Sequence, residues 1–277
     1  MNNPDDMKKM NRLKARGELE RKGVAQEVDF HHFSGERWER SSVHLPSEMP
    51  LTIYVNSQEL VTILCTPIKL NCLVLGFLYA EGIITGTGDV AGMQVCEEES
   101  LADVTLNDSR HEIPAKRTRT SGCGSGTAFE LKGKRVQSDL APTPEELLLL
   151  MRKLKEQMVL HRYCGGVHAS ALSDTKNLLV VAEDIGRHNT LDKIQGECLL
   201  KGLRTRDRLL LSTGRISTEM LLKASKMQVP VVVSRHSPTG RAVSLARDLG
   251  ISLVGHAKGS RLSVYSLPER VQRDQTG

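Results

Sequence analysis

One cysteine of the chain stands in a segment suited to nucleophilic chemistry. Cys123 lies in the stretch RTRTSGCGSG, residues 117–126, which is rich in small residues and has no hydrophobic periodicity. This composition predicts a loop. The two arginines that precede Cys123 favour the thiolate form, which is the nucleophile. Such a sulfur could attack an incoming persulfide and hold its terminal sulfur as Cys–S–SH, although the local sequence also fits an ordinary loop cysteine.

The other cysteines fit a structural role better. Cys65, Cys72 and Cys198 lie in apolar segments that predict core packing. Cys164 precedes a Gly-Gly-Val-His stretch and is the only other cysteine in a predicted loop of interest. The chain has six cysteines and no Cys-x-x-Cys pair, a usage that indicates neither a disulfide framework nor a zinc ribbon.

Four predicted loops share a composition that suits anions. Each combines glycine with Arg or Lys, and they span residues 183–188, 212–215, 234–241 and 255–261. Glycine lets the backbone approach a ligand, a following helix offers free N–H groups, and arginine supplies forked donors. Any one such loop is explained by turn geometry alone, but four together favour a nucleotide-like or multiply phosphorylated ligand. None matches a Walker loop or the G-x-G-x-x-G pattern, so ATP hydrolysis and NAD binding lack support.

Acidic residues and histidines near these loops leave alternatives open. Asp184 and Asp192 flank the first loop, where a carboxylate could read a guanine edge, orient an arginine or cap the helix. His168 and His188 fit either a satisfied polar side chain or a catalytic group.

The elements that must position these residues alternate along the second half of the chain. From about residue 178, apolar β-type runs alternate with helical patterns, which predicts a largely parallel sheet covered by helices. A helix is expected over residues 143–163, with Thr143 as its cap and Pro144 in its first turn. In the first half, the spacing predicts a hairpin around Asn56-Ser57, a helix ending at Gly82, and a further strand pair between residues 86 and 113.

The sequence therefore predicts an α/β protein in three parts. Residues 1–45 are expected to be a charged, partly mobile tail, residues 46–142 a small α+β domain with the cysteine loop, and residues 143–277 an α/β domain. The net charge of +5 suits an anionic ligand or an acidic partner, but it is too small to argue for nucleic acid. No apolar run approaches a membrane span and the first residues lack the apolar centre of a secretory signal, so a cytoplasmic protein without a membrane partner is expected.

Several motifs, in order along the chain, resemble those of the formate dehydrogenase accessory sulfurtransferase family. They are TPIKLNCLVLGFLYAEGII, TRTSGCGSG, GGVHASAL, EDIGRHNTLDK, LSTGRISTEM and SPTGRAVSLARDLGISLVGHAKGSRLSVY. Together they cover the chain from about residue 50 to residue 265.

The resemblance implies a specific function and fold. It implies a cytoplasmic homodimer that acts as a sulfurtransferase, with a C-terminal domain of the cytidine-deaminase-like fold. It further implies that Cys123 accepts sulfur from a cysteine desulfurase and passes it to the bis-guanine-dinucleotide molybdenum cofactor before insertion into formate dehydrogenase. GDP would mimic part of that ligand. From the resemblance and the loop compositions together, the expected ligand-binding residues are His256, Ala257, Lys258, Gly259, Ser260, Arg261, Arg187, Arg215 and Thr239.

One departure from the family pattern and three rival functions accompany the resemblance. Many members carry Cys-Gly-x-Cys, whereas position 126 is glycine here, which predicts a single-cysteine carrier. A zinc deaminase would need Glu at Ser170 and a Cys-x-x-Cys, and both are missing, so no metal site is expected. An RNA-binding protein is disfavoured by the modest charge and few aromatic residues. A cofactor-binding chaperone that transfers no sulfur remains the main alternative.

Overall fold

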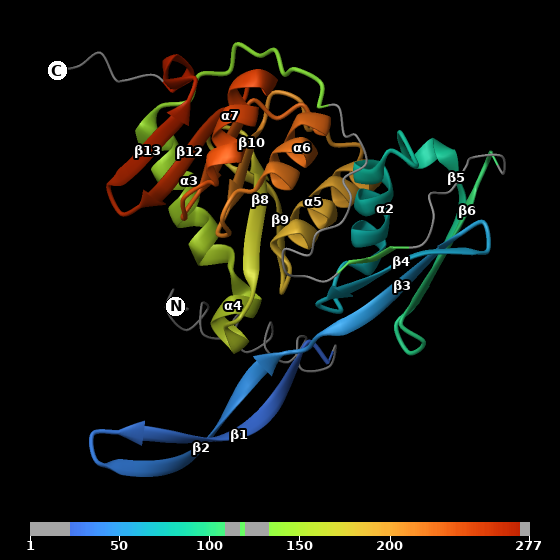
Figure 1. The fold of residues 1–277 in the computed structure, drawn as a ribbon, viewed down its shortest axis with the longest axis vertical. Helices are drawn as coiled ribbons and strands as arrows, with labels where there is room; N and C mark the ends of the chain where they lie inside the picture. Colours follow the sequence, from blue (N-terminus) through green and yellow to red (C-terminus); the bar gives the residue numbers. More distant parts are fainter. Residues whose placement is uncertain (1–22, 109–116, 120–132, 272–277) are drawn as a thin grey trace, which may run out of the picture.

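The computed structural model describes residues 23–108, 117–119 and 133–271, and these form three β-sheets with helices between and around them (Figure 1). The fold is mixed α/β, as the sequence predicts. Within the described ranges, no helix combines the length and the apolar character needed to cross a membrane.

The N-terminal part is a five-stranded sheet that packs on one helix. The strand order is β5-β6-β3-β4-β7, with β3–β6 and β4–β7 parallel and the other pairs antiparallel. The predicted hairpin turns at Asn56 and Ser57, both with positive φ, and the predicted helix ends at Gly82 with φ 79°. The elements are β3 (Met49–Val55), β4 (Gln58–Cys65), α2 (Leu70–Glu81), β5 (Val90–Cys96), β6 (Leu101–Leu106) and β7 (Arg117–Arg119), with a 3-10 turn η1 (Thr87–Asp89).

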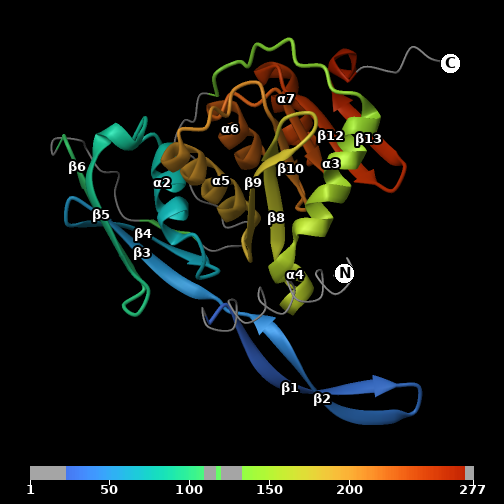
Figure 2. The ribbon, with the colours of Figure 1, turned by 180° about the vertical axis from the view of Figure 1, so that it is seen from behind.

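The C-terminal part is a six-stranded sheet between two helix layers (Figure 2). Helices α5, α6 and α7 share one apolar cluster with one face of the sheet, and α3 shares another cluster with the opposite face. The strand order is β13-β12-β11-β10-β8-β9. The elements are α3 (Pro144–Gln157), α4 (Val159–Cys164), β8 (His168–Ser173), β9 (Leu178–Asp184), α5 (Arg187–Lys201), β10 (Leu209–Ser212), α6 (Thr218–Lys226), β11 (Val231–Ser234), α7 (Gly240–Leu249), β12 (Ser252–Lys258), β13 (Arg261–Ser266) and η2 (Pro268–Arg270).

This sheet is mixed, and the prediction of a largely parallel sheet is right only for part of it. Strands β10, β11 and β12 are parallel, whereas β8 runs antiparallel to both of its neighbours and β13 runs antiparallel to β12. Short turns cause both reversals. Between β8 and β9, the Asp174 carboxylate accepts the N–H groups of Lys176 and Asn177 at 2.7 and 2.6 Å. Between β12 and β13, Gly259 supplies a φ of +64°.

The helix predicted over residues 143–163 is two helices, α3 and α4. Thr143 caps α3 as predicted: its hydroxyl accepts the Glu146 N–H, and the Glu146 carboxylate accepts the Thr143 N–H. The helix is interrupted at Met158. The Glu183 carboxylate accepts the N–H groups of Leu160 and His161 at 2.9 and 2.8 Å, and these bonds start the new helix α4. After this interruption, α4 packs against Val24, at the base of a hairpin formed by residues 25–46.

Two glycines set the contact between the N-terminal and C-terminal parts. A Cβ built on Gly76 of α2 would lie 1.8 Å from the backbone oxygen of Asp192 in α5, and one built on Gly196 of α5 would lie 1.9 Å from that of Cys72 in α2. The residue pairs run in opposite orders, so the helices are antiparallel. Since only glycine allows this approach, α2 and α5 form a close helix–helix contact between the two parts.

Residues 25–46 form a hairpin that projects from the body (Figures 1 and 2), so the predicted tail over residues 1–45 is wrong from residue 25 onward. Its strands are β1 (Ala25–Ser34) and β2 (Arg37–Pro46), and in the described residues they form a sheet of their own. We call these 22 residues the arm. Its base is anchored to the body, because Val24 is buried against Leu160, Cys164 and Val167.

Candidate functional site

The four predicted anion-binding loops lie along one edge of the C-terminal sheet. β10, β11 and β12 are parallel, and β9 points the same way because both β9 and β10 are antiparallel to β8. The first three loops therefore follow the carboxyl ends of β9, β10 and β11 at the same edge, where ligands of α/β proteins bind. The fourth, predicted to be a loop over residues 255–261, is instead the end of β12, a turn at Gly259 and Ser260, and the first residue of β13. The first residue of β8, His168, lies at this edge too, paired with Asp184.

Hydrogen bonds join the second, third and fourth of these segments into a continuous row. The Arg235 N–H donates to the Ser212 oxygen at 3.1 Å, and the Ser234 hydroxyl donates to the Gly214 oxygen at 2.7 Å. Further along, the His256 N–H donates to the His236 oxygen at 3.4 Å. We call this row, together with the first loop, the rim.

The rim is electropositive around Arg187. A Cβ built on Gly214 would lie 3.0 Å from the Arg187 Cβ and 3.3 Å from the His168 Nδ1, so these residues from three loops are packed together. Burial and the positive charges of Arg187 and His236 lower the pKa of His168. A bound anion near Arg187 would offset the effect of that arginine on the His168 pKa, so this part of the rim suits an anionic ligand.

The expected ligand-binding residues differ in their exposure to solvent and in the hydrogen bonds that they already make. Arg215, His256, Lys258 and Arg261 are exposed, and so are Gly259 and Ser260 in the β12–β13 turn. Ala257 is buried. Thr239 is already used as the cap of α7, where its hydroxyl accepts the Ala242 N–H at 3.3 Å.

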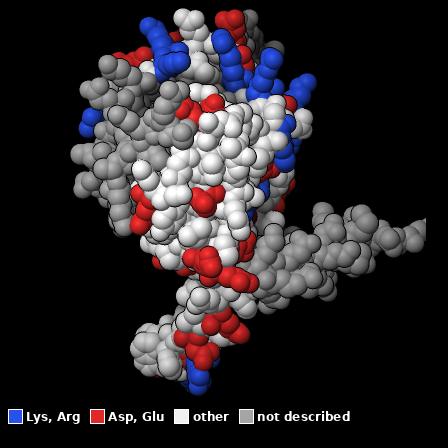
Figure 3. Space-filling model, turned by 90° about the vertical axis from the view of Figure 1, so that its right-hand side faces the viewer, with Lys and Arg blue, Asp and Glu red and all other residues white. Residues whose placement is uncertain are grey.

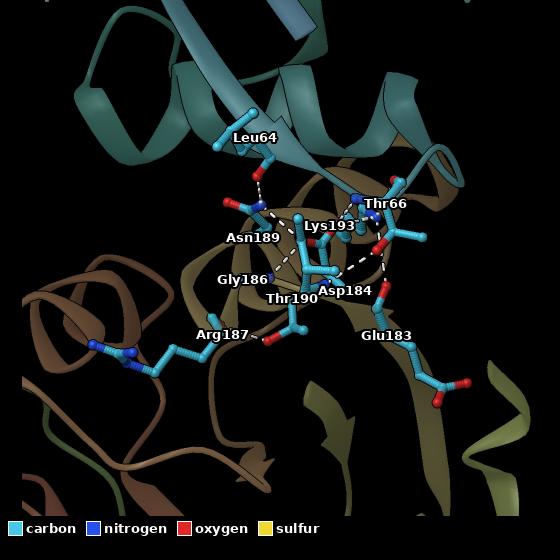
Figure 4. A network of polar contacts seen from close by, with 10 residues as sticks. Leu64, Thr66, Glu183, Asp184, Gly186, Arg187, Asn189, Thr190 and Lys193 are labelled. Atoms are coloured by element: carbon cyan, nitrogen blue, oxygen red, sulfur yellow. Dashed lines mark hydrogen bonds and ion pairs between the residues drawn. The ribbon is translucent and has the colours of Figure 1, made fainter. Parts of the chain in front are cut away.

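Asp184 forms a buried network with residues that the sequence analysis did not single out (Figure 4). Its carboxylate accepts from the Lys193 ammonium at 2.5 Å, and both side chains are fully buried. It also accepts from the backbone N–H of Thr66 at 3.1 Å, of Gly186 at 2.8 Å, and from the Asn189 side chain at 2.8 Å. These partners occupy the Asp184 carboxylate without a side-chain cap bond to the first turn of α5, so the structure gives Asp184 a structural role at this junction and neither the capping role nor contact with a guanine edge.

The same network ties the end of β4 to the first rim loop. The Lys193 ammonium also donates to the Thr66 oxygen at 3.0 Å, and the Asn189 amide donates to the Leu64 oxygen at 2.8 Å. Figure 4 shows the Arg187 side chain pointing away from this network, towards the other rim loops. A buried lysine needs an acidic partner, but the burial of Lys193 is visible only in the fold, so the sequence alone carries no signal for this pair.

Asp192 and His188, for which the sequence leaves both a structural and a functional role open, also have structural partners. Asp192 is buried and accepts from the Lys223 ammonium at 2.6 and 2.7 Å. The His188 ring lies 3.1 Å from the Ser217 hydroxyl, which caps α6. Both residues therefore help to hold α5 against α6.

Cys123 lies outside the described residues, but the strand that precedes it is placed. β7 pairs in parallel with β4, with Arg117 beside Val61 and Arg119 beside Ile63. The carboxyl end of β7 therefore lies next to the carboxyl end of β4, where Thr66 meets Asp184. Cys123 follows Arg119 by four residues.

The buried cysteines of the described residues are poor nucleophiles. Burial raises the pKa of Cys65 and Cys198 to about 12, and it also raises that of Cys72. Burial and the nearby Glu183 carboxylate raise the pKa of Cys164 to about 11. All four thiols stay protonated near neutral pH, which agrees with core packing for the first three.

A metal-binding site of the deaminase kind is not found in the ranges that the structure describes. They contain no cluster of three or more His, Cys, Asp or Glu residues able to hold an ion. Ser170, at the position where such an enzyme carries glutamate, is buried and lies 2.7 Å from the Thr190 hydroxyl.

Comparison with known proteins gives one consistent family. Residues 46–272 match the FdhD/NarQ family. "Sulfur carrier protein FdhD" of Listeria innocua is 40% identical over 235 residues, covering 81% of this chain and 90% of that protein. The protein of the same name in Bacillus subtilis is 38% identical over 236 residues, covering 82% and 89%.

A solved structure shares the fold. It is titled as a putative formate dehydrogenase accessory protein from Desulfotalea psychrophila, and it matches with a TM-score of 0.76 at 24% identity, covering 90% of this chain and all of that one. The family match spans most of the chain and the identities with the two named relatives hold over four-fifths of it. This chain therefore belongs to the FdhD/NarQ family.

Proposed function

We propose that this chain is a sulfur carrier for formate dehydrogenase. Cys123 accepts sulfur from a cysteine desulfurase as a persulfide and transfers it, as a cytoplasmic sulfurtransferase, to the bis-guanine-dinucleotide molybdenum cofactor. The cofactor then enters formate dehydrogenase. The names of the relatives support sulfur carriage, and the rim supports an anionic ligand.

The placement of β7 is the observation that carries this proposal. Its register with β4 directs the chain towards the junction of β4 with the first rim loop, and Cys123 follows four residues later. An extended chain covers about 3.5 Å per residue, so the Cys123 Cα lies within about 14 Å of the end of β7. We propose that a persulfide on Cys123 meets the ligand near this junction, which β7 and the first rim loop share through β4.

The first step needs no external oxidant or reductant. The Cys123 thiolate attacks the terminal sulfur of the desulfurase persulfide, a new S–S bond forms on Cys123, and the old S–S bond breaks. The desulfurase cysteine leaves as a thiolate. The two arginines before Cys123 in the sequence favour its thiolate form.

The dimensions of the rim favour an elongated ligand. The ends of β12 and β9 are four strand spacings apart, which is about 19 Å at about 4.8 Å per spacing. Exposed Arg261 and Lys258 stand at one end, and Arg187 stands at the other. A dinucleotide-sized ligand with several phosphates could contact both ends, whereas a single phosphate could not.

The rival function is a cofactor chaperone that binds the ligand without transferring sulfur. The two are separated by Cys123→Ala, with Cys164→Ala as the matched control, tested for GDP affinity and for maturation of formate dehydrogenase in cells that lack the native protein. A carrier predicts that Cys123→Ala keeps GDP affinity and loses maturation, while Cys164→Ala keeps both. Maturation that survives in Cys123→Ala would favour the chaperone, and loss in Cys164→Ala with folding intact would overturn the single-cysteine mechanism.

The fold relationship implied by the resemblance is part of the same proposal. We propose that the C-terminal domain is cytidine-deaminase-like, supported by its mixed sheet between two helix layers. Superposition on a solved deaminase tests this, and a different strand order in the shared sheet would contradict it.

A further inference from the structure

His168 lies in a cluster of charged and titratable side chains on the rim, where β8 begins between β9 and β10. Its side chain is half-buried. A Cβ built on Gly214 would lie 3.3 Å from the His168 Nδ1 and 3.0 Å from the Arg187 Cβ. Gly214 follows β10 and Arg187 begins α5, so three segments bring the imidazole and the arginine together at the edge of the sheet where ligands bind.

The charges around His168 oppose its protonation. Burial lowers its pKa most, and the positive charge of Arg187 and then the ring of His236 lower it further. His161, from α4, acts in the same direction. Asp184, which pairs with His168 across β8 and β9, acts in the opposite direction, but its carboxylate is already bound by a buried ammonium group. In the free protein His168 is therefore mostly neutral at pH 7.

We propose that the binding of a phosphate-bearing ligand on the rim is coupled to the uptake of a proton by His168. A bound anion beside Arg187 offsets the charge that opposes protonation, and the imidazolium donates a charge-assisted hydrogen bond to a phosphate oxygen. The proton comes from solvent and joins one ring nitrogen, and no bond of the ligand is made or broken. This inference rests on the proposed function, since it concerns the ligand that the rim is proposed to hold. It adds His168 to the ligand-binding residues expected from the sequence.

The direction of the pH dependence follows from this coupling. Because the protonated protein binds the anion more tightly, the affinity is highest at low pH. It falls as pH rises between the pKa values of His168 in the free and the bound protein, and then stays constant. Each unit by which the ligand raises this pKa corresponds to an about tenfold difference in affinity. An opposite charge within about 4–6 Å shifts a pKa by about one unit or more, so the affinity should fall about tenfold between about pH 5.5 and about pH 8.5.

The test needs a probe whose own charge is constant over this range. A terminal phosphate loses its last proton near about pH 6, so the titration of GDP itself would hide the effect. Diguanosine diphosphate, in which two guanosines are joined through a diphosphate bridge, has no terminal phosphate and keeps its charge. Its affinity for the full chain is measured by calorimetry at constant ionic strength. Buffers of different ionisation enthalpy give the number of protons taken up, and circular dichroism at each pH checks folding.

The informative variant is His168→Gln, which keeps a polar side chain and cannot be protonated. The matched control is His31→Gln, because His31 is exposed on the arm. Figure 3 shows the arm extending from the body with mostly acidic side chains and a basic group at its end, a setting unsuited to an anionic ligand. His236 and His256 stay in both variants, so what only His168→Gln loses is due to His168.

The wild type and His31→Gln are expected to show the about tenfold fall in affinity and to take up a proton on binding. In His168→Gln the fall should be about threefold or less, with reduced proton uptake. An equal fall in His168→Gln and the wild type would overturn this inference and leave the proposed function standing. A wild type that binds with the same affinity at every pH and takes up no proton would do the same, whatever the variant does. A folded wild type that does not bind the probe at any pH would contradict the rim as the ligand site and overturn both.

Discussion

The buried pair of Lys193 and Asp184 offers the sharpest test of how the two parts of the molecule are joined. Both side chains have no exposed surface, and the pair links α5 to the end of β9 beside Thr66. Lys193→Met removes the positive charge and keeps most of the volume. It leaves Asp184 with the N–H donors of Thr66, Gly186 and Asn189, but with no countercharge.

Removing one partner of a buried pair costs about 3–5 kcal/mol because an uncompensated charge stays in the interior. We therefore expect Lys193→Met to lower the free energy of unfolding by about 3 kcal/mol, and Asp184→Asn to do the same or more. The double variant removes both charges of the pair. Its loss in the free energy of unfolding should therefore be smaller than the sum of the two single-variant losses by at least about 2 kcal/mol.

Urea unfolding of the two single variants and the double variant measures these free energies. The matched control is Arg40→Met, which breaks the exposed pair with Asp29, and it should cost below about 1 kcal/mol. If Lys193→Met costs no more than Arg40→Met, or if the two single effects simply add, the reasoning about the buried pair is refuted.

Three further expectations follow from particular residues. Gly76→Ala should destabilise by about 1–3 kcal/mol or more, because its methyl carbon would lie 1.8 Å from the Asp192 backbone oxygen, while Gly92→Ala, with nothing within 4 Å, should be near neutral in urea unfolding. The lowered pKa of His168 means that the unfolded chain binds a proton more readily, so stability should fall as pH drops below about 6.5, and it should fall less in His168→Gln; equal losses in both would contradict this. Cys164, with its pKa raised to about 11, should resist alkylation at pH 8 until the protein unfolds, and rapid labelling in peptide mass spectra of the native protein would show that its thiol is accessible after all.

The sequence predicted most of the elements that carry strong periodicity. The hairpin at Asn56-Ser57, the helix ending at Gly82 and the strand–helix alternation after residue 178 are present in the structure. These elements follow local rules of turns, caps and apolar spacing, which a single sequence displays.

The features that the sequence did not predict depend on tertiary contacts. Strand β8 reads HASALS, and its small residues give no hydrophobic signal although five of its six positions are buried in the sheet. The break at Met158 depends on Glu183, which lies 25 residues away in sequence. The sequence predicts a charged tail where the arm lies because this segment is rich in Lys, Arg and Glu, and only cross-strand pairing reveals its apolar face.

The sequence predicts the loops of the candidate site, but it does not predict the contacts that hold these loops in place. Glycine with arginine after each strand indicated the rim, but nothing local indicated that Thr66 would meet Asp184 or that Gly214 would pack on Arg187 and His168. These contacts join segments far apart in the chain, and only the fold brings them together.

The most direct test of the central claim is the mass of the Cys123 peptide after sulfur loading. The purified protein is incubated with a cysteine desulfurase and cysteine, alkylated, and digested for mass spectrometry. The sulfur-carrier function predicts one added sulfur atom on the Cys123 peptide, and none in the Cys123→Ala variant. The absence of added sulfur on that peptide, with a desulfurase shown to be active, would contradict it.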